Sequence, residues 1–284
     1  MEGMGQHTKV HHYRERLQQE AWLRLKRLAQ HAWYGPRRQG PAAVAFIAGV
    51  QRSGTNMLMD VLEQSLLTDV YHERDARAFD NYSMRDIDTI AALHRRCRAP
   101  YFIIKSLCEL QRLPQLRQRF PGARIVWIVR HYDDVVNSML VSFRNHASQI
   151  RRLAQDRLAV DWRGEGMSDA TQALLQRFAG PELSDASGAA LMWYLRNVLF
   201  FEQGFDRDEA VLLVSYERLV AAPQAEFARI FAFLGLPYRH WHSRRVVASS
   251  VGRRQPPAIE PSVRAECDAL LGRFQALLPA GGRI

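Results

Sequence analysis

The feature that most constrains the fold is an apolar run that enters a glycine-rich turn and continues at once as a helix. It occupies residues 45–58, with the sequence AFIAGVQRSGTNML. Such a turn directs backbone N–H groups and the positive end of the helix at one point, which favours a bound phosphate. Gly49 and Gly54 have the spacing of a nucleotide-binding P-loop. Thr55 stands where the P-loop lysine would follow, and Arg52 is the cation inside the turn.

From residue 41 onward, short β-rich runs alternate with helical stretches. The runs are apolar on both faces, which predicts a parallel sheet covered on each side. We therefore expect a doubly wound α/β domain with a P-loop-like nucleotide site over residues 41–284, with helices and loops from 144 to 185 that cap the site. The expected strands are Val44–Ala48, Asp69–Tyr71, Tyr101–Ile104, Arg124–Val129 and Ala210–Val214, and the expected helices are Asn56–Leu67, Asp133–Phe143, Ala189–Phe201 and Gln224–Leu234.

Residues 1–40 are expected to form an N-terminal helical extension. Apolar side chains recur at helical spacing over residues 10–33, with Arg and Gln between them, and Gly35 and Pro36 end the pattern. This amphipathic helix either packs on the domain or offers a basic surface to a membrane or an acidic polymer. No apolar run approaches the roughly 20 residues of a membrane span.

Cysteine usage and the N-terminal composition bear on location. Cys97, Cys108 and Cys267 are too few and too scattered for a disulfide framework or a zinc site. The N-terminus lacks the apolar core of a secretory signal. These features predict a cytoplasmic protein. The formal net charge of +10 suggests anionic partners, but the cations are dispersed and no nucleic-acid-binding motif accompanies them, so no nucleic-acid partner is expected.

The glycine-rich turn resembles a known family motif. Its segment QRSGTNML, residues 51–58, is similar to the 5′-phosphosulfate loop of sulfotransferases that use 3′-phosphoadenosine-5′-phosphosulfate (PAPS) and release 3′-phosphoadenosine-5′-phosphate (PAP). The resemblance covers about residues 41–260. It implies that the 5′-phosphosulfate is held by Arg52, Ser53, Gly54, Thr55 and Asn56.

Three later segments are also similar to the family. Residues 124–138, RIVWIVRHYDDVVNS, resemble its 3′-phosphate motif, in which Arg130 and Ser138 would bind that phosphate; alternatively, Arg130 is a surface residue paired with Asp. The segment VLLVSYERL at 211–219 would place Tyr216 near the adenine, unless it is a core aromatic. Arg253, in a basic loop, either closes over the nucleotide or is solvated.

The resemblance also implies the catalytic residues. Sulfuryl transfer needs charge stabilisation on the leaving phosphate and a base for the acceptor proton. Arg52 and the loop amides can stabilise the charge on the leaving phosphate without a metal. Lys105 matches the family lysine that reaches the bridging oxygen. Leu107 stands where phenol and steroid sulfotransferases have their histidine. Tyrosylprotein and many carbohydrate sulfotransferases use a glutamate instead, which implies Glu73 as the base, with His72 as the alternative.

These observations predict an enzyme that transfers a sulfuryl group from PAPS to a hydroxyl or amine acceptor. The departure at Leu107 favours a carbohydrate or a complex natural product over a small phenol. An ATP-dependent P-loop phosphotransferase or kinase is the alternative, although it would need the absent P-loop lysine and an acidic Mg²⁺ strand. A non-catalytic anion-binding protein is the third possibility. No metal is expected in the leading interpretation.

Overall fold

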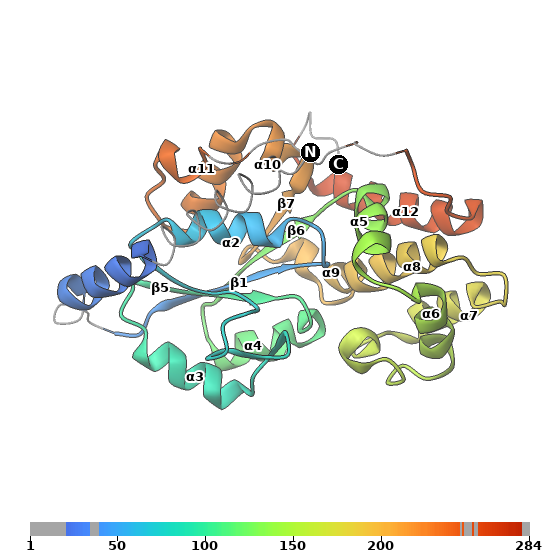
Figure 1. Ribbon diagram of the computed structural model, residues 1–284, viewed down its shortest axis with the longest axis horizontal. Helices are drawn as coiled ribbons and strands as arrows, with labels where there is room; N and C mark the ends of the chain where they lie inside the picture. Colours follow the sequence, from blue (N-terminus) through green and yellow to red (C-terminus); the bar gives the residue numbers. More distant parts are fainter. Residues whose placement is uncertain (1–20, 35–39, 245, 247–251, 253–254, 280–284) are drawn as a thin grey trace, which may run out of the picture.

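The structure is a computed structural model that describes residues 21–34, 40–244, 246, 252 and 255–279. Its centre is a five-stranded parallel sheet with strand order β2-β5-β1-β6-β7 (Figure 1). All five expected strands and the α/β fold class are confirmed. The strands are β1 (Ala43–Gly49), β2 (Thr68–Tyr71), β5 (Tyr101–Ser106), β6 (Arg124–Val129) and β7 (Val211–Ser215).

Helices cover both faces of this sheet (Figure 1). Neighbouring residues of β1 point to opposite sides, so Phe46 packs into one hydrophobic cluster and Ile47 into the other. Because both clusters exclude water, the interiors of the central strands β1 and β6 read as apolar in sequence. One face is covered by α2 (Thr55–Glu63), α10 (Tyr216–Ala221) and α11 (Pro223–Leu234), and the other by α3 (Ile87–Arg96) and α4 (Leu113–Arg119).

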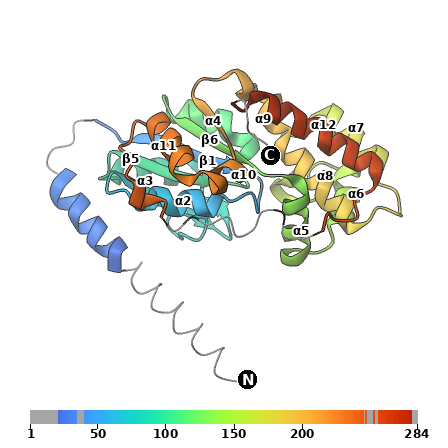
Figure 2. The ribbon, with the colours of Figure 1, turned by 90° about the horizontal axis from the view of Figure 1, so that it is seen from above.

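A group of helices extends the molecule beyond the sheet (Figures 1 and 2). At its centre α8 contacts α5, α6 and α12. The prediction of helices and loops from 144 to 185 is confirmed, whereas α12 has no counterpart among the expected elements. The group comprises α5 (Tyr132–Ser142), α6 (His146–Gln155), α7 (Asp169–Phe178), α8 (Asp185–Asn197), α9 (Leu199–Glu202) and α12 (Pro261–Leu277).

Two expected helices have different ends in the structure. The helix expected to reach residue 67 ends at residue 63, because the Thr68 hydroxyl donates to the carbonyl of Leu62 (2.7 Å) and turns the chain into β2. The helix expected over residues 189–201 begins four residues earlier, where the Ser184 side chain accepts from a backbone N–H of the first turn, and it breaks at Val198.

The N-terminal helix is described over residues 21–34 and packs at the edge strand β2. The buried Lys26 ammonium donates to the hydroxyl of Thr68 (3.3 Å), and the Gln30 amide donates to the carbonyl of Thr68 (2.8 Å). This is the first of the two expected arrangements. Leu25 and Leu28 point away, 63% and 68% exposed, and contact with a membrane or an acidic polymer stays a prediction. None of the helices in the described ranges is long and apolar enough to cross a bilayer.

Candidate active site

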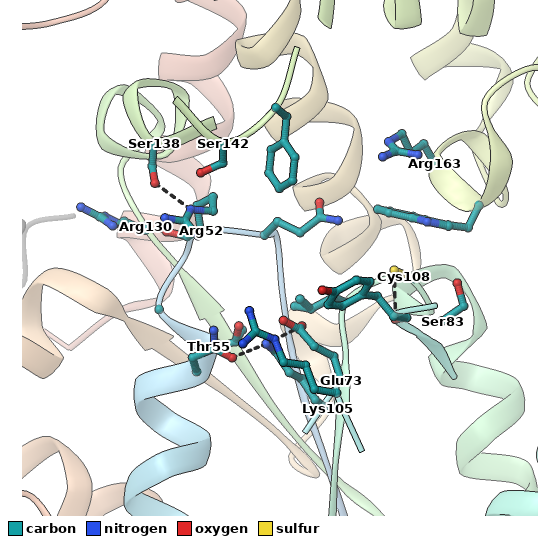
Figure 3. A pocket seen from close by; sticks show the side chains of 18 of the residues that line it. Arg52, Thr55, Glu73, Ser83, Lys105, Cys108, Arg130, Ser138, Ser142 and Arg163 are labelled. Carbon is teal, nitrogen blue, oxygen red and sulfur yellow. Dashed lines mark hydrogen bonds and ion pairs between the residues drawn. The ribbon is translucent and has the colours of Figure 1, made fainter. Parts of the chain in front are cut away.

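Candidate site residues at the ends of all five strands meet at one edge of the sheet. Gly49 ends β1, Lys105 is the next-to-last residue of β5, and Arg130 directly follows β6. Tyr216 follows β7, and Glu73 lies two residues after β2. Parallel strands present their carboxyl ends together, and ligands of open α/β sheets bind there. The loops at this edge enclose a cavity of about 960 Å³ (Figure 3).

The loop after β1 is shaped to receive an anion. Arg52 and Gly54 have left-handed backbone conformations, with φ of 72° and 95°. Thr55 and Asn56 begin α2 and line the cavity. Within the described chain, no side chain caps this helix. Its first N–H groups therefore face the cavity with the positive end of the helix dipole, a combination that favours phosphate or sulfate oxygens.

Two arginines stand at the loop end of the cavity (Figure 3). The Arg52 Nε donates to the Ser138 hydroxyl at 2.7 Å, which joins the loop to α5. Arg130 donates to the carbonyl of Arg52 (3.2 Å) and pairs with Asp134 one helical turn into α5 (3.2 Å). Its guanidinium lies 4.3 Å from the ring centre of Tyr216. Both cations and the serine hydroxyl therefore converge on one small region that suits a doubly charged ligand.

A buried ion pair lies in the middle of the cavity. The Lys105 ammonium is 2.6 Å from the Glu73 carboxylate and donates to the Asn56 side-chain oxygen at 2.5 Å (Figure 3). Lys105 is 1% exposed and Glu73 is 19% exposed, so the carboxylate is the partner that a ligand can reach. Burial lowers the pKa of Lys105, and the contact with Glu73 opposes that shift. An ammonium has three N–H donors, and these contacts use two of them.

His72 is arranged differently from its neighbour Glu73. Its Nε2 is 3.4 Å from the carboxylate of Glu63, a buried residue of α2. Glu73 lines the cavity, whereas His72 is absent from its lining. The chain turns directly after β2, where the Asp75 N–H donates to the His72 carbonyl at 2.8 Å, and this turn separates the two side chains.

The other end of the cavity is built by loops from outside the sheet. A two-residue turn, Asn81 and Tyr82, joins the short strands β3 (Phe79–Asp80) and β4 (Ser83–Met84). A 3₁₀ turn at Asp161–Gly164 supplies the facing side. Figure 3 shows Ser83, Cys108 and Arg163 at this end, away from Arg52 and Arg130. The lining residues here are Asn81, Tyr82, Ser83, Cys108, Asp161, Trp162 and Arg163.

The comparison with known families agrees with this geometry. A model described as "Sulfotransferase family" matches residues 65–240, more than half of the chain. The chain belongs to the sulfotransferase family. No curated protein matches this sulfotransferase by sequence.

Solved structures of sulfotransferases resemble this one. The sulfotransferase domain from the curacin biosynthetic pathway matches with a TM-score of 0.50 and 13% identity, over 85% of this chain and all of that one (100%). At that identity the likeness shows the fold alone. Mouse sulfotransferase SULT7A1 complexed with PAP has a TM-score of 0.46 at 16% identity, covering 88% of this chain and 91% of that one. A sulfotransferase from Alicyclobacillus acidocaldarius has a TM-score of 0.47 at 20% identity, covering 84% of this chain and 96% of that one.

The structure places most of the sequence-predicted residues of this sulfotransferase around the single cavity. Arg52, Gly54, Thr55, Asn56, Glu73, Lys105, Arg130, Ser138 and Tyr216 all line it. Ser53 does not: its side chain is fully buried, and its hydroxyl has no hydrogen-bond partner among the described residues. Ser53 could therefore contribute only through its backbone. Arg253 lies outside the described residues. No group of three or more potential metal ligands occurs in the described ranges.

Sequence reasoning missed the residues at the far end of the cavity. The turn at Asn81 could have been found, because Asn favours the left-handed conformation (φ 45°) that two-residue hairpin turns require. Trp162 and Arg163 carry no such local signal, since the segment around them is polar and irregular.

Packing at the loop after β1 leads to a first prediction. A methyl group at Gly54 would overlap the ring of Tyr216. Gly54→Ala is therefore expected to lower the free energy of unfolding by roughly 1–3 kcal/mol more than the left-handed backbone alone would. Each kcal/mol lowers the melting temperature by about 2–4 °C. The matched control is Gly122→Ala, which has a similar φ of 77° and open space around the new methyl. Equal melting temperatures for both variants would contradict the packing of Tyr216 on the loop.

Proposed function

We propose that this sulfotransferase transfers a sulfuryl group from PAPS to a hydroxyl or amine of a carbohydrate or another complex natural product. The observation that carries the proposal is the shared cavity: the anion-binding loop after β1 and the Glu73–Lys105 pair face the same space. A donor anion at the loop and an acceptor at Glu73 would then meet beside Lys105.

The nucleotide end would hold PAPS through two phosphate sites. The N–H groups at the start of α2, with Arg52 and Thr55, suit the 5′-phosphosulfate. Arg130 and Ser138 suit the 3′-phosphate, because a guanidinium presents parallel donors to phosphate oxygens. Tyr216, which packs against both Gly54 and Arg130, would border the nucleotide.

The chemistry would divide between Glu73 and Lys105. Glu73 accepts the acceptor proton as the acceptor oxygen or nitrogen bonds to sulfur, while the bond from sulfur to the bridging oxygen breaks and PAP leaves. Lys105, fixed by Asn56, pairs with Glu73 and has a remaining N–H for the leaving oxygen. Arg52 offsets the growing charge on the phosphate. These steps need only groups that already lie in the cavity.

The far end of the cavity supports a large acceptor with several polar groups. Tyr82 and Trp162 offer apolar surface, and Asn81 and Ser83 offer hydrogen bonds. A few placed polar groups among aromatic side chains are typical of sites for mid-sized organic ligands. The family membership does not favour the ATP-dependent phosphotransferase or the non-catalytic anion-binding protein.

A thermal-shift experiment tests the nucleotide part of the proposal. PAP at 100 times its dissociation constant should stabilise the protein by about 2.7 kcal/mol, and EDTA should not reduce the effect. The comparison ligand is ATP with Mg²⁺, which has a triphosphate but no 3′-phosphate. Strong stabilisation by ATP with Mg²⁺ and none by PAP would replace the sulfotransfer proposal with the phosphotransferase.

A further inference from the structure

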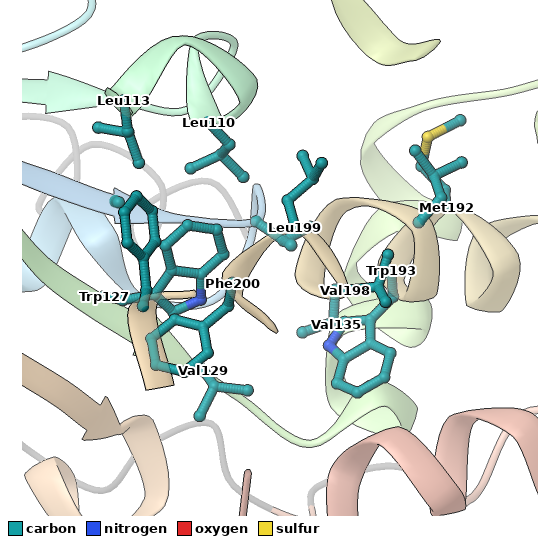
Figure 4. Close-up of a cluster of buried hydrophobic side chains, with 14 of the residues drawn as sticks. Leu110, Leu113, Trp127, Val129, Val135, Met192, Trp193, Val198, Leu199 and Phe200 are labelled. Carbon is teal, nitrogen blue, oxygen red and sulfur yellow. The ribbon is translucent and has the colours of Figure 1, made fainter. Parts of the chain in front are cut away.

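A fully buried arginine lies behind the acceptor end of the cavity. Arg196, in the last turns of α8, is 1% exposed. The helix is fixed in the core through Trp193, which lies in a cluster of buried hydrophobic side chains (Figure 4). The indole N–H of Trp193 donates to the carbonyl of Arg130 at 3.1 Å. Arg196 therefore projects from a rigid support.

The guanidinium of Arg196 joins two segments that are distant in sequence. One nitrogen donates to the carbonyls of Trp162 and Arg163, both at 3.4 Å. The other donates to the carbonyls of Leu107 (3.3 Å) and Cys108 (3.4 Å). All four carbonyls belong to residues that line the cavity. The guanidinium also lies 4.9 Å from the ring centre of Trp162.

A second set of contacts ties the same two segments together. Gln111 receives a hydrogen bond from Arg196 (2.9 Å) and donates to Glu165 (2.8 Å). Arg112 adds a two-pronged pair with Glu165, with contacts of 2.8 and 2.9 Å. The segment 160–165, which we name the wall segment, is thus held at its middle and at its last residue against the loop that follows β5.

Stability alone does not account for a charge at this position. Burial lowers the pKa of Arg196 to about 10, so it remains a cation at neutral pH. Within the described ranges no carboxylate forms an ion pair with it, and its charge is met by carbonyl and amide oxygens. Burying an ion is costly, and an apolar side chain of similar size often serves stability equally well. What an apolar side chain lacks is the ability to hold four carbonyls in a fixed arrangement.

We propose that Arg196 is a positioning residue for acceptor binding. It fixes the wall segment, with Trp162 and Arg163, relative to the loop two residues beyond Lys105. The distance between the acceptor surface and the reacting pair is therefore set by a residue that touches neither ligand. The assignment of this end of the cavity to the acceptor rests on the proposed function, whereas the contacts of Arg196 do not depend on that function.

The test is hydrogen exchange of the wall segment in Arg196→Lys, which keeps the charge but loses the planar fork of donors. Backbone amides of residues 160–165 should exchange about 10-fold faster or more, as expected for lost hydrogen bonds to a charged group. PAP affinity, measured by calorimetry, should change less than about twofold, because Arg196 contacts no residue of the phosphate sites. Unchanged exchange over 160–165 would overturn the proposal, as would a parallel loss of PAP affinity.

Two further variants keep the test decisive. Arg229→Met removes a half-buried arginine that donates to the carbonyl of Leu213 and pairs with Glu226, none of which lines the cavity. It should lower stability without changing exchange of the wall segment; faster exchange there would mean that Arg196 acts through general stability. Glu165→Gln removes the charge from the second set of contacts, at a partly exposed position, and should also speed that exchange. If Arg196→Lys does not fold, unchanged exchange in Glu165→Gln would count against the proposal.

The two proposals can fail separately. Hydrogen exchange is measured with and without PAP. If the wild-type protein does not bind PAP, the proposed function is contradicted, whereas the effect of the variants on exchange of the wall segment is unaffected. If PAP binds normally and exchange of the wall segment is unchanged in the variants, the role of Arg196 is contradicted and the proposed function is not.

Discussion

Glu73→Gln is expected to abolish measurable sulfuryl transfer while leaving PAP affinity nearly unchanged. A general base contributes roughly 10²- to 10⁴-fold to a rate, and the amide cannot take up the acceptor proton. The proposed nucleotide contacts lie on the loop after β1 and on Arg130, so binding of PAP is not expected to need the carboxylate. The measurement pairs a transfer assay using labelled PAPS with calorimetric titration of PAP.

The ion pair makes a matched control necessary for this variant. Glu73→Gln also deprives the buried Lys105 of its charged partner, which lies at 2.6 Å. Asp75→Asn removes the charge from a second pair of carboxylate and cation in the same segment, with the more exposed Arg77 at 2.5 Å, outside the cavity lining. Asp75→Asn should retain turnover. Wild-type turnover in Glu73→Gln would remove Glu73 from the mechanism and would make His72 the next candidate, despite its contact with Glu63.

Arg130→Ala should weaken PAPS binding by roughly 30- to 4,000-fold, which corresponds to about 2–5 kcal/mol for losing a charged partner of a desolvated phosphate. Adenosine 5′-phosphosulfate, which differs from PAPS only in lacking the 3′-phosphate, should bind weakly to both wild type and variant, with little change between them. Competition against labelled PAP measures both ligands.

A neighbouring arginine provides the control for Arg130. Arg264 pairs with Asp133 of α5 at 3.0 Å, as Arg130 pairs with Asp134 on the same helix, but Arg264 does not line the cavity. Arg264→Ala should therefore leave the affinity for PAPS unchanged. If Arg130→Ala weakens both nucleotides equally, Arg130 acts on the 5′ end or only supports the loop through the carbonyl of Arg52.

The parts of the site that follow strands were predictable from sequence. The phosphate loop, Arg130 and Tyr216 each sit where an apolar run ends and a helix begins, and that signal is contained within about ten residues. The contact between Glu73 and Lys105 could not be predicted from the sequence around either residue. It arises from the parallel register of β2 and β5, in which Tyr71 lies opposite Ile104, so that the residues just beyond both strands meet.

The sequence by itself determined the layered α/β architecture and the anion-binding loop, because apolar periodicity, glycine conformation and helix polarity act over a few residues. Only the tertiary structure decided which side chains share the cavity. The hairpin at Tyr82, the turn at Trp162 and the support from Arg196 come together through strand order and the packing of α8, and these depend on contacts between residues far apart in the chain. Such contacts leave no local pattern, since many sequences can fill the same loop positions once the layers are in place.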